Sequence, residues 1–120
     1  MQVQVNTGNG VQNKESLDRW ATDFLNEELA RFRQELTRIE VQLTDGNRGK
    51  GGSDDKRCML EARLTGREPV AVNHQGATMD EAIRGATTKL VRAIEHILGK
   101  LDRHQHRDRE SIRKSESLLG

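Results

Sequence analysis

The sequence is poor in the residues from which disulfide frameworks, membrane spans and aromatic binding surfaces are built. Its 120 residues include one cysteine, one proline, one tryptophan, two phenylalanines and no tyrosine. A single cysteine cannot form an internal disulfide, which fits a reducing compartment. No apolar run approaches the roughly 20 residues that a membrane-spanning helix needs, and the alternating N-terminal residues are unlike a signal or transit peptide. We therefore expect a soluble cytoplasmic protein that does not contact a membrane.

An excess of charge of either sign is also missing. The chain has 20 Lys and Arg against 19 Asp and Glu, which gives a formal net charge of +1 at pH 7. Only 32% of the residues are hydrophobic, so one small core leaves little room for a buried catalytic cavity. A nucleic-acid partner can therefore be argued only from where the basic residues lie, because acids balance their number.

Hydrophobic periodicity predicts six elements. Alternation of apolar and polar residues indicates strands at residues 2–7, 39–45, 57–65 and 69–75. Apolar residues at steps of three and four indicate helices from Lys14 to about Thr37 and from Met79 to about Arg103. Four glycines and no apolar residue at 46–56 predict a flexible hairpin loop.

The resulting order, β-α-β-β-β-α, predicts a two-layer α+β fold. A right-handed crossover through the first helix makes the first two strands parallel, and short turns make the later neighbours antiparallel. Each strand has one apolar face, so both helices should cover the same face of a four-stranded mixed sheet. We expect one domain at residues 1–103 and a polar, disordered tail at 104–120. The other sheet face would meet water or a partner.

Local signals mark the start of both helices. Asn13 is expected to cap the first helix by accepting a hydrogen bond from a backbone N–H of the first turn. In the stretch TMDE, Thr78 and Glu81 are expected to form a capping box, in which each side chain bonds the backbone N–H of the other residue.

A basic stripe runs along the second helix, beside its apolar one. At 100° per residue the stripe falls in a band roughly 80° wide, about 120° around the helix from the apolar residues. Its members are Lys89, Arg92, His96, Lys100, Arg103 and Arg107. The acids Glu95 and Asp102 fall beyond one flank of this band. One helical turn rises about 5.4 Å, close to the phosphate spacing of a nucleic-acid strand, so the stripe could follow a phosphate backbone. A solvated face that serves solubility is an equally good interpretation.

Three other features could carry chemistry, but each has a plainer explanation. The stretch GNRGKGGS lacks phosphate-loop spacing and joins two antiparallel strands instead of opening a helix. His104 and His106 have no further metal ligands at suitable spacing. Cys58 alternates with Leu60 on a core face, as a small buried hydrophobe does. Neither a catalytic arrangement nor an aromatic-lined pocket is apparent. We expect no enzyme, cofactor, metal site or small-molecule substrate.

The element order and several stretches resemble the ribosome hibernation promoting factors and ribosome-associated inhibitors of bacteria, also called the sigma-54 modulation protein family. The stretches are VQVNTGNGVQ, TRIEVQL and HQGATMDEAIRGATTKLVRAI. In the last of these, the residues that match the family pattern are Met79, Ala82, Ile83, Lys89, Leu90 and Arg92. The likeness spans about residues 1–104, and the chain resembles the short form or the inhibitor paralogue, between which the tail does not decide. The sequence departs from the family at EHIL, residues 95–98, where a denser basic run is usual, and at Glu27, where Lys is frequent.

The resemblance implies a function in translation. Family members bind the small ribosomal subunit in the channel used by messenger and transfer RNA, through basic residues on both helices, and silence translation in stress or stationary phase. Carried over to this chain, that role falls to Lys89, Arg92, His96, Lys100 and Arg103, which would bind 16S rRNA; Lys is common in the family at the position of His96.

Two alternatives stay open at this point. The near-neutral charge, the acidic first helix and the exposed position expected for Met59 would also suit a protein-interaction module of the same fold that does not bind RNA. An enzyme acting on a small metabolite has only the glycine-rich loop in its favour. The sequence does not decide whether idle ribosomes would be paired or kept single.

Overall fold

The structure is a computed structural model of the chain that describes residues 1–8, 11–46 and 56–117, with side chains as far as Gly99. Its elements, in chain order, are β1 (Gln2–Thr7), α1 (Lys14–Glu28), the 3-10 turn η1 (Ala30–Phe32), β2 (Leu36–Asp45), β3 (Lys56–Leu64), β4 (Val70–Gly76) and α2 (Met79–Ser117). The predicted loop at 46–56 lies largely outside the described residues.

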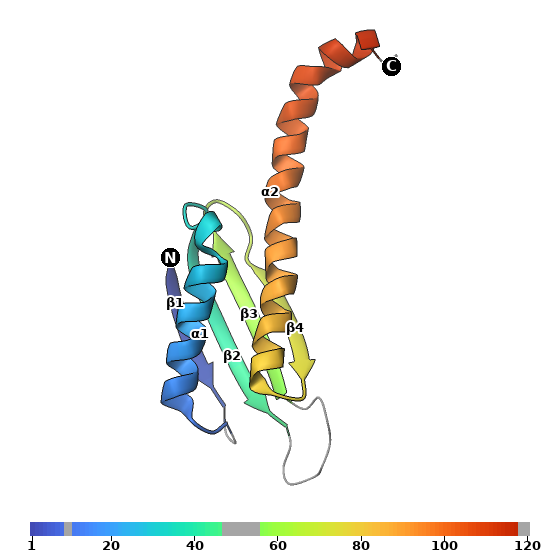
Figure 1. Cartoon of the computed structure of the whole chain (residues 1–120). Helices are drawn as coiled ribbons and strands as arrows, with labels where there is room; N and C mark the ends of the chain where they lie inside the picture. Colours follow the sequence, from blue (N-terminus) through green and yellow to red (C-terminus); the bar gives the residue numbers. More distant parts are fainter. Residues whose placement is uncertain (9–10, 47–55, 118–120) are drawn as a thin grey trace.

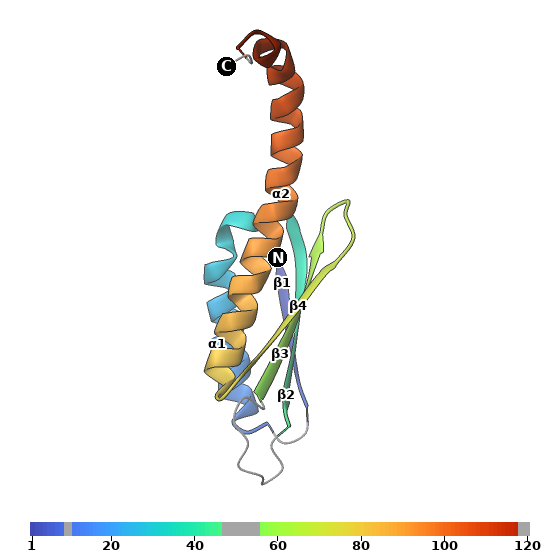
Figure 2. The same ribbon diagram turned by 90° about the vertical axis from the view of Figure 1, so that its right-hand side faces the viewer.

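The four strands form one sheet in the order β1-β2-β3-β4. β1 runs parallel to β2, while β3 is antiparallel to both of its neighbours. Both helices lie on the same face of this sheet, which the two views of the ribbon show (Figure 1, Figure 2). The predicted two-layer α+β fold is confirmed.

The core fills the space between the sheet and the helices. Alternate residues of the two central strands turn fully inward, namely Ile39, Val41, Leu43, Cys58, Leu60 and Ala62. They meet the apolar stripes of the helices, whose fully buried members are Ala21, Leu25, Ala82, Ile83, Ala86, Leu90 and Ile94. The period of two in the strands and of three to four in the helices therefore has one cause, the burial of a single face.

The first helix is shorter than predicted. It ends at Glu28, the turn η1 follows, and β2 begins at Leu36, where continued helix was expected. Leu29, Phe32 and Leu36 are nevertheless all buried. A turn that buries residues at steps of three and four has the same apolar pattern as a helix, so the pattern located core residues correctly and their conformation wrongly.

The predicted cap of α1 is also wrong. Asn13 occupies the N-cap position, but its backbone is left-handed, at φ 56° and ψ 46°, and its side chain caps no backbone N–H. Capping normally requires an extended backbone at this position. The carbonyl of Asn13 instead accepts from Ser16 Oγ at 3.3 Å and from the Leu17 N–H at 2.9 Å.

The capping box of α2 forms with one change. Thr78 Oγ1 accepts from the Glu81 N–H at 3.1 Å, as predicted. Glu81 reaches back to the N–H of Ala77 at 3.0 Å, one residue before the N–H that was expected. The start of α2 is therefore fixed by two side chain to backbone bonds.

The helix α2 is longer than predicted. Its backbone continues to Ser117, past the expected end near Arg103, and it extends beyond the sheet (Figure 1). Side chains after Gly99 lie outside the described residues, and the division into a domain at 1–103 and a tail at 104–120 stays a prediction. No described helix is both long enough and apolar enough to span a bilayer.

Candidate nucleic-acid interface

Three of the predicted binding residues lie together on α2. Lys89, Arg92 and His96 are all exposed. Lys89 Nζ donates to the backbone carbonyl of Asn73 in β4 at 2.9 Å, so this side of α2 faces the β4 edge of the sheet. We call Lys89, Arg92 and His96 the β4-side stripe. Lys100 and Arg103 follow on the same helix, but their side chains lie outside the described residues.

Two of the three described acids of α2, Asp80 and Glu95, lie on the side of α1, while the third, Glu81, caps the helix start at Ala77. Glu95 Oε2 lies 2.5 Å from Nη2 of Arg31, which belongs to the turn after α1. Asp80 accepts from Arg84 Nε at 2.7 Å, and the Arg84 guanidinium lies over the ring of Trp20 in α1. Among the described side chains, neither Arg92 nor His96 takes part in an ion pair. Arg92 and His96 are therefore separate from Glu95, the described acid nearest to them in the helix, and are open to a partner.

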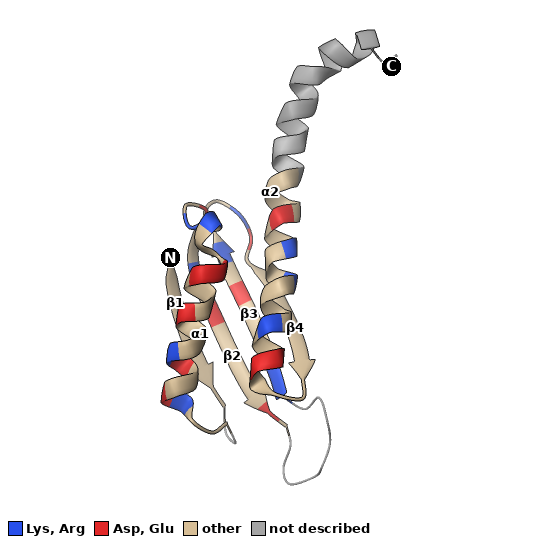
Figure 3. Cartoon of the chain, viewed as in Figure 1, with Lys and Arg blue, Asp and Glu red and all other residues tan. Residues whose placement is uncertain are grey.

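Helix α1 does not add to a basic surface. Between Lys14 and Glu28 it has two basic residues, Lys14 and Arg19, against five acidic ones. Figure 3 shows both signs along this helix. The resemblance implies basic residues on both helices. In the described part of the chain, the β4-side stripe of α2 is the part of this expected surface that the helices present.

Sequence reasoning missed the position of His74. A Cβ built on Gly85 would lie 2.0 Å from Cδ2 of His74, so the imidazole packs directly on the backbone of α2. Gly85 is four residues before Lys89, and thus on the same face of the helix. A glycine inside a helical pattern was the available signal, because such a glycine often marks a close approach of another group. His74 lies at one end of the stripe and His96 at the other.

The single thiol of the chain is not accessible for covalent or metal chemistry. Cys58 is fully buried, and burial raises the pKa of its thiol from 9.0 to about 12. It is a buried hydrophobe, as predicted. No three His, Cys, Asp or Glu side chains gather into a possible metal site among the described residues. The pair His104 and His106 lies beyond the described side chains.

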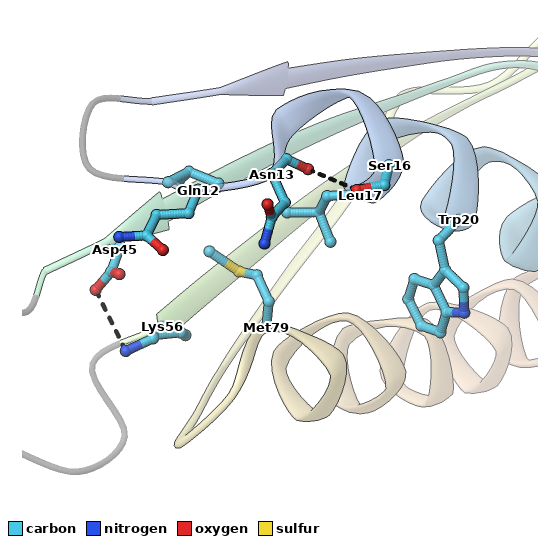
Figure 4. Close-up of a pocket in the computed structure, with 9 residues that line it drawn as sticks. Gln12, Asn13, Ser16, Leu17, Trp20, Asp45, Lys56 and Met79 are labelled. Carbon is cyan, nitrogen blue, oxygen red and sulfur yellow. Dashed lines mark hydrogen bonds and ion pairs between the residues drawn. The ribbon is translucent and has the colours of Figure 1, made fainter.

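Sequence reasoning did not locate a pocket whose lining includes one aromatic side chain, Trp20. A pocket of about 530 Å³ opens between the first turns of both helices and the loop ends of β2 and β3. We call it the end pocket; it is lined by Val11, Gln12, Asn13, Ser16, Leu17, Trp20, Asp45, Lys56 and Met79 (Figure 4). Its residues come from segments far apart in the chain, so periodicity within any one segment could not reveal it.

Comparison with known proteins places the chain in a family. A family model described as "Sigma 54 modulation protein / S30EA ribosomal protein" matches residues 4–102. A ribosomal subunit interface protein from Coxiella burnetii has a similar structure, with a TM-score of 0.62 and 22% identity over 82% of this chain and 99% of that one. The N-terminal domain of Protein Y from Thermus thermophilus gives a TM-score of 0.58 and 22% identity, over 81% and 99%.

No curated protein matches the chain. At 22% identity the two solved structures show a shared fold. The family match is broader, because residues 4–102 include all of α1, β2, β3 and β4 and parts of β1 and α2. The resemblance noted in the sequence is thereby confirmed: the chain belongs to the sigma 54 modulation protein / S30EA ribosomal protein family, a family of ribosome-associated factors.

Proposed function

We propose that this protein binds the 16S rRNA of the small ribosomal subunit in the channel of transfer and messenger RNA, and so keeps idle ribosomes silent under stress or in stationary phase. It would act in the cytoplasm by steric occlusion, without chemistry. Family membership supports the ribosomal partner. The observation that carries the RNA contact is the exposure of Lys89, Arg92 and His96 on one flank of α2, while Glu95 is paired with Arg31 on the other.

The chemistry of this stripe suits a phosphate backbone. Arg92 presents a planar guanidinium that can donate two parallel hydrogen bonds to one phosphate. Lys89 already donates to Asn73 and keeps further N–H groups on the same ammonium for a second acceptor. Contacts of this kind read the shape of an RNA surface and hold it, and they carry little base specificity.

Co-sedimentation with purified ribosomal subunits tests the proposal. The full chain should pellet with small subunits at low salt, and reversing two charges of the stripe's helix, Arg92→Glu with Lys100→Glu, should abolish pelleting while the circular dichroism spectrum stays unchanged. A matched variant with a reversed charge on the other helix, Arg19→Glu, should pellet as the parent chain does. Failure of the parent chain to pellet with either subunit at low salt would reject the proposal.

One observation favours a second candidate, a protein-interaction module that does not bind RNA. Met59 is 41% exposed on the sheet face that no helix covers, and an exposed large apolar side chain is common at protein contacts. The discriminating experiment is a pull-down with and without nuclease. Capture of one protein that survives nuclease and is lost in Met59→Lys would favour this candidate over RNA binding.

A further inference from the structure

We propose that the end pocket is a binding site for a nucleobase. Its volume of about 530 Å³ lies within the roughly 300–1,000 Å³ that small-ligand sites span. Trp20 stands at one end and the pair formed by Asp45 and Lys56 at the other, with Asn13, Leu17 and Met79 between them (Figure 4). The pocket thus combines an apolar, partly aromatic wall with polar groups around it.

The apolar wall suits a flat ring. Trp20, Leu17 and Met79 are each half-buried and border the same space, which the buried Val11 also lines. Stacking on an aromatic side chain is available to every base, because every base has a π-face. Thioether sulfur also makes favourable contacts with aromatic rings. A planar heterocycle that stacks on Trp20 would also border Leu17 and Met79.

The indole of Trp20 is held in place before any ligand arrives. It stacks on Phe24 with ring centroids 5.0 Å apart and an interplanar angle of 7°. The guanidinium of Arg84 lies 5.4 Å from the Trp20 centroid and 5.0 Å from that of Phe24, and Asp80 fixes Arg84 in turn at 2.7 Å. A ligand that stacks on Trp20 would lose less free energy to ordering the site, because the side chain is already fixed.

The polar groups of the pocket favour an uncharged ligand with an edge of donors and acceptors. Gln12 and Asn13 are primary amides, each with a carbonyl and an NH₂ side by side, which is the arrangement that pairs with the edge of a base. The charged lining residues are one acid and one base, Asp45 and Lys56, 3.6 Å apart. Their charges cancel, so the lining has no net charge with which to prefer an anion.

A nucleobase could reach the pocket from a free nucleotide or from single-stranded RNA. The second source rests on the proposed function. Met79 at the pocket precedes Lys89 of the β4-side stripe by ten residues of α2, about 15 Å along the helix axis. That spacing is short enough for one RNA strand to place a base in the end pocket and phosphates at the stripe.

The chain supplies its own probe of this site. Trp20 is its single tryptophan, and the sequence has no tyrosine, so indole fluorescence reports the pocket alone. The full chain is titrated separately with the four ribonucleoside monophosphates, with a short unstructured RNA of mixed sequence, and with ribose 5-phosphate as the baseless control. The indole N–H resonance of Trp20 is followed by NMR in the same titrations, because nucleotides absorb exciting light.

Saturable quenching and a saturable resonance shift are expected with nucleotides or RNA and not with ribose 5-phosphate. Two variants remove the amides: Gln12→Ala, and Asn13→Gly, which suits the left-handed backbone at this position. Each should weaken binding by roughly five- to tenfold, as loss of one hydrogen bond does. The control Gln42→Ala, an exposed amide on the far sheet face, should bind as the parent chain does.

Each outcome decides between sources or rejects the site. Binding of nucleotides and RNA alike supports a base site open to both, while binding of RNA alone supports a base site within the RNA interface. If nucleotides bind but the chain does not pellet with ribosomes, the base site is supported and the proposed function is rejected. If the chain pellets with ribosomes but the Trp20 signal does not change, the proposed function is supported and the base site is rejected. The pocket proposal is overturned if Trp20 does not respond to any base, or if the amide variants bind as tightly as the parent.

Discussion

Arg92 is the residue on which the proposed RNA contact depends most directly. It is exposed, and no described acid pairs with it. Arg92→Ala should therefore weaken binding to small subunits and make the salt dependence shallower, by about one unit in the slope of log affinity against log salt. Stability should change by no more than about 0.5 kcal/mol, because the side chain is on the surface. Binding curves at several salt concentrations, with Arg19→Ala as the control, measure the effect. An unchanged slope would remove Arg92 from the interface.

Gly85 offers a test of how α2 meets the sheet. In Gly85→Ala the new Cβ would lie 2.0 Å from the His74 ring. The imidazole or the helix must then move, which should lower the free energy of unfolding by about 1–3 kcal/mol. Gly99→Ala on the same helix has open space around it and should gain up to about 1 kcal/mol in helix propensity. Urea unfolding compares the two.

A smaller side chain opposite Gly85 should relieve the clash. The double variant Gly85→Ala with His74→Ala is expected to be more stable than the sum of the single effects, because the two sites are in contact. Additive effects would mean that the imidazole moves away at no cost.

Cys58 should make the folded state sensitive to alkaline pH. Burial raises its thiol pKa from 9.0 to about 12, so above pH 9 the unfolded chain loses this proton and the folded chain keeps it. The unfolded state then binds fewer protons, and the free energy of unfolding falls as pH rises between 9 and 12, by at most about 1.4 kcal/mol per pH unit from this group. Urea titrations at several alkaline pH values, compared with Cys58→Ala, isolate the contribution. Parallel curves for both chains would contradict it.

At the scale of single elements, the capping box at the start of α2 can be tested by one substitution. Thr78→Ala removes the acceptor for the Glu81 N–H and should destabilise the fold by about 1 kcal/mol. Thr88→Ala is the matched control, because Thr88 lies inside the same helix and bonds only the Arg84 carbonyl, a contact that contributes little. Thermal and urea unfolding should separate the two variants. Equal effects would show that the cap does not anchor α2.

The elements also show how far sequence reasoning reaches. Alternation placed β2 and β3 within three residues of their bounds, because one face of each strand is fully buried. The same logic placed the start of α2, where Thr78 and Glu81 form a box. It failed at the end of α1, because Leu29 and Phe32 stay buried in a turn. The side-chain cap expected from Asn13 does not form. The sequence pattern predicts which residues are buried. Whether they are buried from a helix or from a turn depends on tertiary contacts.

Taken as a whole molecule, the protein carries its basic surface as a narrow strip and not as a net charge. The members of the predicted strip share one helix face in the sequence pattern, and Lys89, Arg92 and His96 lie together on that face as exposed side chains. The end pocket and the contact of His74 with Gly85 were not predictable, since both join residues that only the three-dimensional fold brings together.

A narrow strip sets the salt dependence of the assembled complex. If about four cations contact phosphates, log affinity for the small subunit should fall with log salt at a slope of roughly −3 to −4. Sedimentation of the full chain with small subunits over a salt series measures this slope. A slope near zero would indicate a contact that does not depend on phosphate charge, and would favour a protein partner.

The bond from Lys89 to Asn73 has one more consequence. β4 is the last strand of the sheet, and the outward carbonyls of such a strand are acceptors on which an extended segment of another molecule can align. The side chain of Lys89, bonded to the Asn73 carbonyl of this strand, obstructs that alignment, and Pro69 just before the strand removes a donor from the same margin. We therefore expect the contact of Lys89 with Asn73 to disfavour sheet-to-sheet association along this border, and Lys89 is also a residue that we assign to ribosomal RNA.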